Sequence, residues 1–156
     1  MKKEFVHSTD CDDIEMGVRE VIDGRRVYVT PEGNVYPSIT SILGQQPKPG
    51  IEEWKEKIGH QEANKIMKES AALGTMVHSL CEDYLYNEKL KCEDQEAISV
   101  FNRLRFLLGN IDNIHGIEIP LHSDILKVAG TADCVAEYNG VLSVIDFKTS
   151  RKPKRE

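Results

Sequence analysis

The sequence predicts an α/β domain in which a central mixed β-sheet is flanked by helices. Apolar residues recur at helical spacing between residues 51 and 110, whereas short β-branched runs dominate residues 111–150. Asn139-Gly140 stands between two apolar runs, which is a strong local signal for a β-hairpin. A chain of 156 residues suits a single domain with one core.

The N-terminal third is expected to be the least regular part. Residues 1–24 are polar and acidic, and we expect them to be flexible. Within residues 25–50, the run 26–30 and the pair Val35-Tyr36 flank turn residues, which predicts a small hairpin. Residues 44–50 carry two prolines and two glycines, and they are expected to form a loop.

Three helical segments are predicted in the helical part, residues 51–110. The first covers about 51–70, with Trp54, Ile58 and Ile66 in its apolar stripe. Gly74-Thr75 interrupts the pattern, so either a new helix begins at Thr75 or the backbone closely approaches another part of the molecule. The other two segments cover about 76–86 and 94–108.

The sheet is expected in residues 111–150. Strands are predicted at 114–121, 126–129, 133–138 and 141–147, and the last two flank Asn139-Gly140. This pair predicts a two-residue type I′ turn. Both faces of the hairpin are mostly apolar, with Val135 and Val144 on one and Ala136 and Ile145 on the other. A sheet covered on both sides would explain that pattern.

The hairpin register places two carboxylates face to face. If Asn139 and Gly140 form the loop, Asp133 lies opposite Asp146, and Lys148 points to the same side. Facing carboxylates repel each other, and a divalent cation such as Mg²⁺ would relieve the repulsion. Lys148 could polarise the attacking water or neutralise charge on a phosphate. The arrangement therefore indicates phosphodiester cleavage. The alternative is a solvent-exposed carboxylate pair with Lys148 in a local salt bridge. A β-bulge would also change the register, and the two aspartates would then no longer face each other.

Three further residues are weaker candidates. His78 and Glu82 share one helix face, so His78 could complete a metal site with Glu82 orienting it. Glu118 could be another acid near the site. Each residue also has an ordinary explanation, since His78 could simply pack, Glu82 could be a helix-surface carboxylate, and Glu118 could be an exposed strand residue.

Composition narrows the class of protein. The net charge is −6, which argues against coating nucleic acid by bulk attraction, but residues 148–156 hold five basic residues and one acidic residue. The four cysteines form no CxxC pair, so we expect scattered reduced thiols. The sequence shows no signal peptide and no membrane-length apolar run, so no membrane partner and a cytoplasmic location are expected.

Several motifs together resemble a known nuclease family. GTMVHSLCEDYL, GIEIPL, AGTADCVAEYNG and VIDFKTS resemble the RecB-type branch of the PD-(D/E)XK nucleases. YPSITSIL and IEEWKEKIG are similar in particular to exonucleases of phages and of mitochondrial genome maintenance. The resemblance covers about residues 25–150, and it implies a restriction-endonuclease-like core.

The resemblance also implies roles for the matching residues. Asp133 and Asp146 would be the metal carboxylates, with His78 and the Phe147 carbonyl as further ligands and Lys148 as the catalytic lysine. Such enzymes cut single-stranded DNA from an end with Mg²⁺ or Mn²⁺. A phage origin would make the location a host cytoplasm. The basic tail is a candidate DNA-binding segment, or merely a solvated charge run; its residues are Arg151, Lys152 and Lys154.

The C-terminus departs from the family pattern. Members usually continue past DFKTS into a helix with a glutamine and a tyrosine, whereas this sequence ends at Glu156. We therefore expect the C-terminal part of the family core to be missing. Two alternatives to a single-strand exonuclease stay open: a structure-specific endonuclease with the same site, and a catalytically incomplete DNA-binding module.

Overall fold

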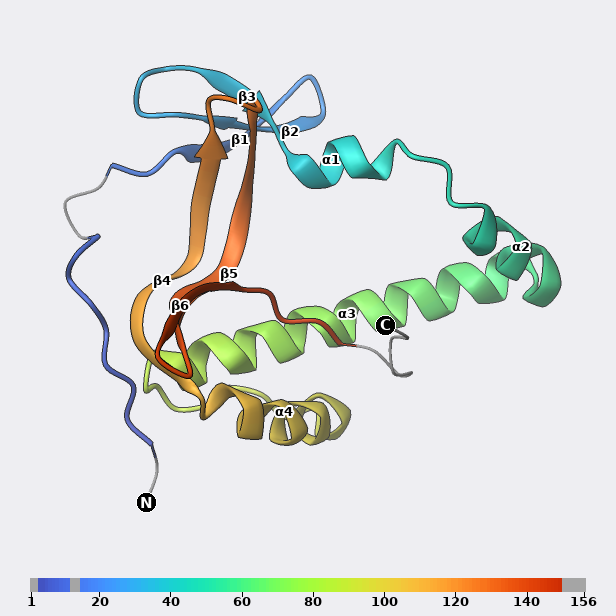
Figure 1. Cartoon of the computed structure of the whole chain (residues 1–156). Helices are drawn as coiled ribbons and strands as arrows, with labels where there is room; N and C mark the ends of the chain where they lie inside the picture. The colour runs from blue at the N-terminus through green and yellow to red at the C-terminus, as the bar shows by residue number, and fades with distance from the viewer. Residues whose placement is uncertain (1–2, 12–14, 150–156) are drawn as a thin grey trace. The chain divides into compact units, whose positions relative to one another are not determined.

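The computed structural model describes residues 3–11 and 15–149 (Figure 1). These residues form two compact units. The helical unit comprises the described residues of 3–6, 48–112 and 147–149, and the sheet unit comprises those of 7–47 and 113–146. The chain is therefore mixed α/β, as predicted, with two three-stranded sheets. The basic tail of residues 151, 152 and 154 lies outside the described residues.

Three helices build the helical unit. They are α2 (Pro49–Ile58), α3 (His60–Leu85) and α4 (Gln95–Leu108). Pro49 suits the first turn of α2 because it lacks only an N–H that has no helical partner there. Gly59, with φ of 90°, separates α2 from α3. Asp94 caps α4 by accepting a hydrogen bond from the Ala97 N–H at 2.8 Å.

Helix α3 runs without a break through Gly74-Thr75. The prediction of a new helix at Thr75 is therefore wrong, and the chain turns instead at Gly59. The alternative explanation for Gly74 fits the structure, because a Cβ atom there would lie 3.5 Å from Thr149 Oγ1. Gly74 thus lies where the segment after Phe147 approaches α3.

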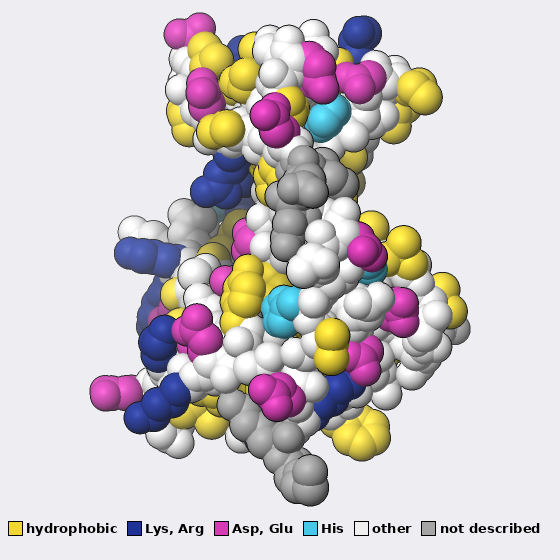
Figure 2. All heavy atoms as spheres, turned by 90° about the vertical axis from the view of Figure 1, so that its left-hand side faces the viewer, with side chains coloured by type: hydrophobic (Ala, Val, Ile, Leu, Met, Phe, Trp, Pro, Cys, Tyr) yellow, Lys and Arg dark blue, Asp and Glu magenta, His cyan; other side chains and the backbone are white. Residues whose placement is uncertain are grey.

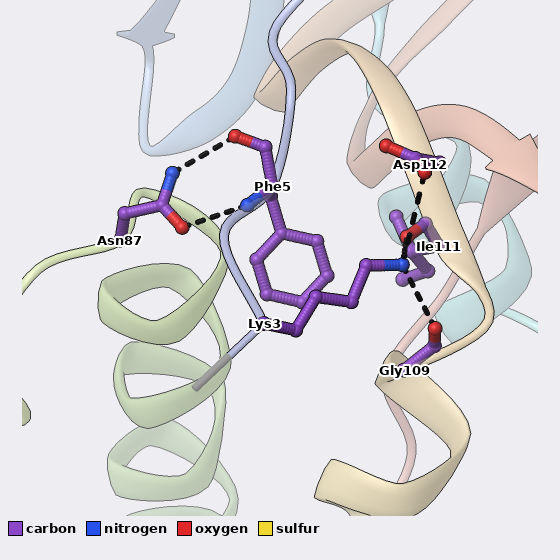
Figure 3. A network of polar contacts seen from close by, with 6 residues as sticks. All are labelled: Lys3, Phe5, Asn87, Gly109, Ile111 and Asp112. Atoms are coloured by element: carbon purple, nitrogen blue, oxygen red, sulfur yellow. Dashed lines mark hydrogen bonds and ion pairs between the residues drawn. The ribbon is translucent and has the colours of Figure 1, made fainter. Parts of the chain in front are cut away.

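The core of the helical unit lies between α3 and α4, which run side by side in Figure 1. Tyr84 makes edge-to-face contacts with Phe101, at a centroid distance of 5.6 Å, and with Phe5, at 5.0 Å. The N-terminal segment is fixed by polar contacts as well (Figure 3). The Asn87 side chain hydrogen-bonds both backbone groups of Phe5, and Lys3 Nζ donates to two carbonyls, those of Gly109 and Ile111.

The first sheet of the sheet unit contains β1 (Val18–Ile22), β2 (Arg25–Val29) and β3 (Val35–Pro37). All its pairings are antiparallel, and helix α1 (Ile39–Gly44) follows. Strand β1 falls within residues 1–24, and the flexibility expected of that stretch stays a prediction. Asp23 and Gly24 both have positive φ, at 50° and 73°, and form the hairpin turn that the polar composition obscured.

The second sheet has the order β4 (Ile111–Ser123), β5 (Val128–Tyr138), β6 (Val141–Ile145). Strand β5 joins two strands that were predicted separately. Tyr138 pairs with Val141, and Asn139 and Gly140 between them have φ of 51° and 78°. Both three-stranded sheets are antiparallel, so the prediction of one central mixed sheet is wrong.

Strand β6 is an edge strand, and its apolar side chains are exposed. Val141, Leu142 and Val144 retain 65%, 65% and 68% of their accessible surface. The prediction that both faces of the hairpin are covered is therefore wrong for the described residues. Burial in this hairpin is concentrated on β5, at Cys134 and Ala136.

Candidate functional site

Two carboxylates meet within the sheet unit. Asp133 is half-buried on β5, and a carboxylate oxygen of Glu118 on β4 lies within 4.8 Å of one of its oxygens. Two carboxylates at this distance repel each other unless a proton or a cation lies between them. Oxygen donors in this arrangement suit Mg²⁺ or Mn²⁺. Glu118, expected only as a secondary acid, is thus a direct candidate ligand.

The backbone of β4 departs from regular strand geometry at Glu118, which affects the direction of its side chain. Its φ is 51°, a left-handed conformation that is uncommon for a residue other than glycine. A Cβ atom on the nearby Gly116 would lie 2.8 Å from Ile119 Cδ1, so a larger residue at this position would have to displace the Ile119 side chain. Such local departures from regular strand geometry re-aim side chains and concentrate at functional sites. No periodicity in the sequence signals this conformation.

Asp146 and Lys148 follow β6 directly and are exposed. The register of β5 and β6 agrees with the one deduced from the loop, since Cys134 pairs with Ile145. The paired ladder ends there, one step short of Asp133 and Asp146. The facing of these two aspartates therefore stays a prediction.

His78 lies within the helical unit, half-buried on α3. Its Nε2 atom is 2.5 Å from the carbonyl oxygen of Phe147, and the two rings make an edge contact with centroids 5.8 Å apart. Phe147 itself is buried. The two non-carboxylate ligands predicted for the metal therefore contact each other directly, with the imidazole nitrogen and the carbonyl oxygen at hydrogen-bond distance.

Cys134, beside Asp133, is a fully buried free cysteine. Burial, with a smaller contribution from the charge of Asp133, raises the pKa of its thiol to about 12. The thiol is consequently neutral near pH 7 and is not activated for nucleophilic attack. None of the four cysteines, all of which lie in the described part of the chain, forms a disulfide.

Glu82 lies one turn beyond His78 on α3 and is half-buried. Its role in orienting His78 stays a prediction. Tyr28 and Tyr36 are 3% and 6% exposed and belong to a core cluster with Ala129. Trp54 is half-buried on α2. Core packing therefore accounts for both tyrosines.

Comparison with known proteins identifies relatives of one kind. The chain is 31% identical over 131 residues to mitochondrial genome maintenance exonuclease 1 of Mus musculus. The aligned region covers 78% of the chain and 39% of the relative. The human protein of the same name is 31% identical over 132 residues, covering 78% and 38%. The Xenopus tropicalis protein is 33% identical over 129 residues, covering 76% and 37%. No family model matches the chain.

Its relatives are exonucleases. These matches support an exonuclease family for the chain, which spans about two fifths of the length of the relatives it matches. Among the described residues, no helix combines the length and apolar character needed to cross a bilayer. The relatives are mitochondrial by name, and the cytoplasmic location expected for this chain stays a prediction.

Proposed function

We propose that the chain is the catalytic region of a metal-dependent DNA exonuclease with a PD-(D/E)XK site. The observation that carries the proposal is the approach of the Asp133 and Glu118 carboxylates on neighbouring strands. It occurs in a chain whose curated relatives are genome maintenance exonucleases. The motif Asp146-Phe147-Lys148 directly follows the strand paired with β5.

Mg²⁺ or Mn²⁺ fits the residues present. Asp133 and Asp146 would supply carboxylate oxygens, and Glu118 would act as a ligand or as a nearby acid. His78 Nε2 and the Phe147 carbonyl would supply the remaining protein donors. Hard oxygen donors with a single imidazole suit these two cations. The bound cation would supply positive charge for a phosphate oxygen and lower the pKa of a coordinated water.

In the proposed reaction, a water oxygen forms a bond to phosphorus and the bond from phosphorus to a sugar oxygen breaks. The water loses a proton, and the leaving oxygen gains one. Lys148 would hold the attacking water and offset negative charge on the phosphate through its ammonium group. Phe147 lies buried between Asp146 and Lys148, which fixes the segment that carries both side chains.

Single-stranded DNA is the proposed substrate. Negative charge predominates in the sequence, and Figure 2 shows acidic side chains dispersed among hydrophobic and basic ones. Such a surface disfavours metal-independent binding along a duplex, which carries the denser charge. The basic tail, Arg151, Lys152 and Lys154, is proposed to contact the strand near the site. An end-dependent, exonucleolytic mode follows the relatives' names.

Replacement of Asp133 by Asn tests the proposal. Removal of one metal carboxylate should reduce cleavage of end-labelled single-stranded DNA in Mn²⁺ by about 100-fold or more. The cation would bind more weakly, and the scissile phosphate would lose the positive charge that positions it. Denaturing gels measure the rate, and loss of mononucleotides from the labelled end identifies exonuclease action. Glu20→Gln is the matched control, since it removes an exposed carboxylate on β1 of the same unit.

Equal cleavage by wild type and Asp133→Asn would overturn the assignment of the site. Cutting of circular single-stranded DNA would replace the exonuclease with an endonuclease. Binding of DNA without cleavage by the wild type in Mn²⁺ would support a catalytically incomplete module instead.

A further inference from the structure

The sheet unit contains a second polar feature, a hollow between the start of β2 and helix α1. Its volume is about 640 Å³. The residues that line it include two arginines, two residues with hydroxyl groups and a glutamine: Gly24, Arg25, Arg26, Thr40, Ser41 and Gln45. These residues come from two segments that are separated in sequence by the whole of β3.

The chemistry of the hollow is that of an anion site. None of the described acidic residues lines it, and both arginines are exposed. Neither arginine forms an ion pair with another described residue. Guanidinium groups bind phosphate oxygens through two parallel hydrogen bonds, and the hydroxyls of Thr40 and Ser41 add neutral donors. A phosphate group would therefore find both charge and hydrogen-bond donors here.

The walls of the hollow are held together by hydrogen bonds. The Ser38 N–H donates to the Arg26 carbonyl at 3.2 Å, and the Ser38 and Thr40 hydroxyls lie 2.8 Å apart. Ser38 is 1% exposed and also forms a β-bridge with Ala129 on β5. The first turn of α1 is thus fixed against β2 and β5 before any ligand binds.

A series of side chains on β2 and β5 connects the hollow with Asp133. Arg26 and Tyr28 are two residues apart on β2 and share one face. The Tyr28 hydroxyl lies 2.9 Å from Thr131 Oγ1 on β5. Thr131 and Asp133 are also two residues apart and share one face. The hollow therefore lies toward the side of β5 that presents the Asp133 carboxylate.

We propose that this hollow binds a backbone phosphate of the DNA strand, a few nucleotides from the bond that is cleaved. The proposal rests on the function proposed above.

The test is the double variant Arg25→Gln/Arg26→Gln, with Arg19→Gln as control. Arg19 is an exposed arginine on β1 that does not line the hollow. Binding of a fluorescent oligothymidylate is measured by anisotropy in Ca²⁺ at several salt concentrations. The double variant should bind about tenfold more weakly, and the salt slope should fall by about 0.7 for each phosphate that the protein no longer neutralises. Arg19→Gln should bind as the wild type does.

Cleavage separates this proposal from the proposed function. The double variant should raise KM for a long oligonucleotide but leave cleavage of thymidine 5′-(p-nitrophenyl phosphate), which is too short to reach the hollow, unchanged. Unchanged DNA affinity and salt slope would overturn the phosphate site. So would weaker binding of inorganic phosphate with unchanged oligonucleotide binding, because the hollow would then take a free anion. Absence of cleavage by the wild type would refute the nuclease function, while weaker oligonucleotide binding by the double variant would still support the hollow.

Discussion

At the scale of single residues, Glu118 combines a left-handed backbone conformation with a carboxylate that lies close to Asp133. A left-handed φ costs of order 1–3 kcal/mol in a residue other than glycine unless its surroundings compensate. Glycine or asparagine would adopt it more easily, yet neither could offer a carboxylate to a metal beside Asp133. The combination of φ 51° with an oxygen within 4.8 Å of Asp133 supports the role proposed above for this side chain.

Glu118→Gln should weaken binding of Mn²⁺ by about tenfold or more, because the substitution keeps the size of the side chain and removes its charge. Isothermal titration of the purified chain with Mn²⁺ gives the affinity, and thermal unfolding without metal reports on the fold. Glu20→Gln serves as the exposed control on β1. An unchanged Mn²⁺ affinity would show that Glu118 is not a ligand, whereas the Asp133 assignment would still stand.

At the scale of elements, helix α3 carries a glycine that the helix itself does not need. Gly74 has ordinary helical φ, and its Cβ position meets Thr149 Oγ1 at 3.5 Å, which is normal van der Waals contact. Alanine fits such a space, whereas a larger side chain would have to displace the segment that follows Phe147. The glycine therefore limits the size of the side chain that faces that segment.

Gly74→Ala should stabilise the protein by about 0.5–1 kcal/mol, since alanine loses less backbone entropy in a helix than glycine does. Gly74→Leu should destabilise it, because the branched side chain would clash with Thr149. Urea unfolding followed by circular dichroism measures both effects. Destabilisation by alanine would mean that the segment lies closer to α3 than 3.5 Å allows.

The sequence predicted elements well where one local signal decided them. The predicted helix 94–108 matches α4 within one residue, because an Asp cap precedes a clear apolar stripe. Asn139-Gly140 likewise predicted the pairing of Tyr138 with Val141. The polar composition of residues 1–24 hides strand β1, although Asp23-Gly24 is itself a hairpin signal. The proximity of Glu118 to Asp133 depends on tertiary pairing and a positive φ, which periodicity cannot report.

At the scale of the whole molecule, the edge strand β6 has consequences for solution behaviour. Its three valine and leucine side chains are each about two thirds exposed. Among the described strands, none pairs with the outer edge of β6. An exposed apolar edge can pair with another chain, and natural proteins commonly prevent this with lysine.

Val144→Lys should therefore reduce concentration-dependent self-association, which sedimentation velocity measures. Its effect on the free energy of unfolding should stay within about 0.5 kcal/mol, as for other exposed positions. Val135→Lys, at the half-buried position paired with Val144, is the contrasting variant and should destabilise the fold. A loss above about 2 kcal/mol on Val144→Lys would show that this side chain is covered in solution.

Figure 3 shows Lys3 and Phe5 hydrogen-bonded to residues that come more than 80 positions later in the sequence. The helical unit also takes residues 147–149, and the sheet unit takes residues up to 146. Synthesis on the ribosome proceeds from the N-terminus, so neither unit has all its parts until nearly the whole described chain has emerged. Lys3 and Phe5 stay without these contacts until Asn87 and Gly109 have been synthesised, which exposes the N-terminal segment to chaperones and proteases during translation. Slowing translation after the codon for residue 112 should therefore affect the yield of folded protein more than slowing it before that codon.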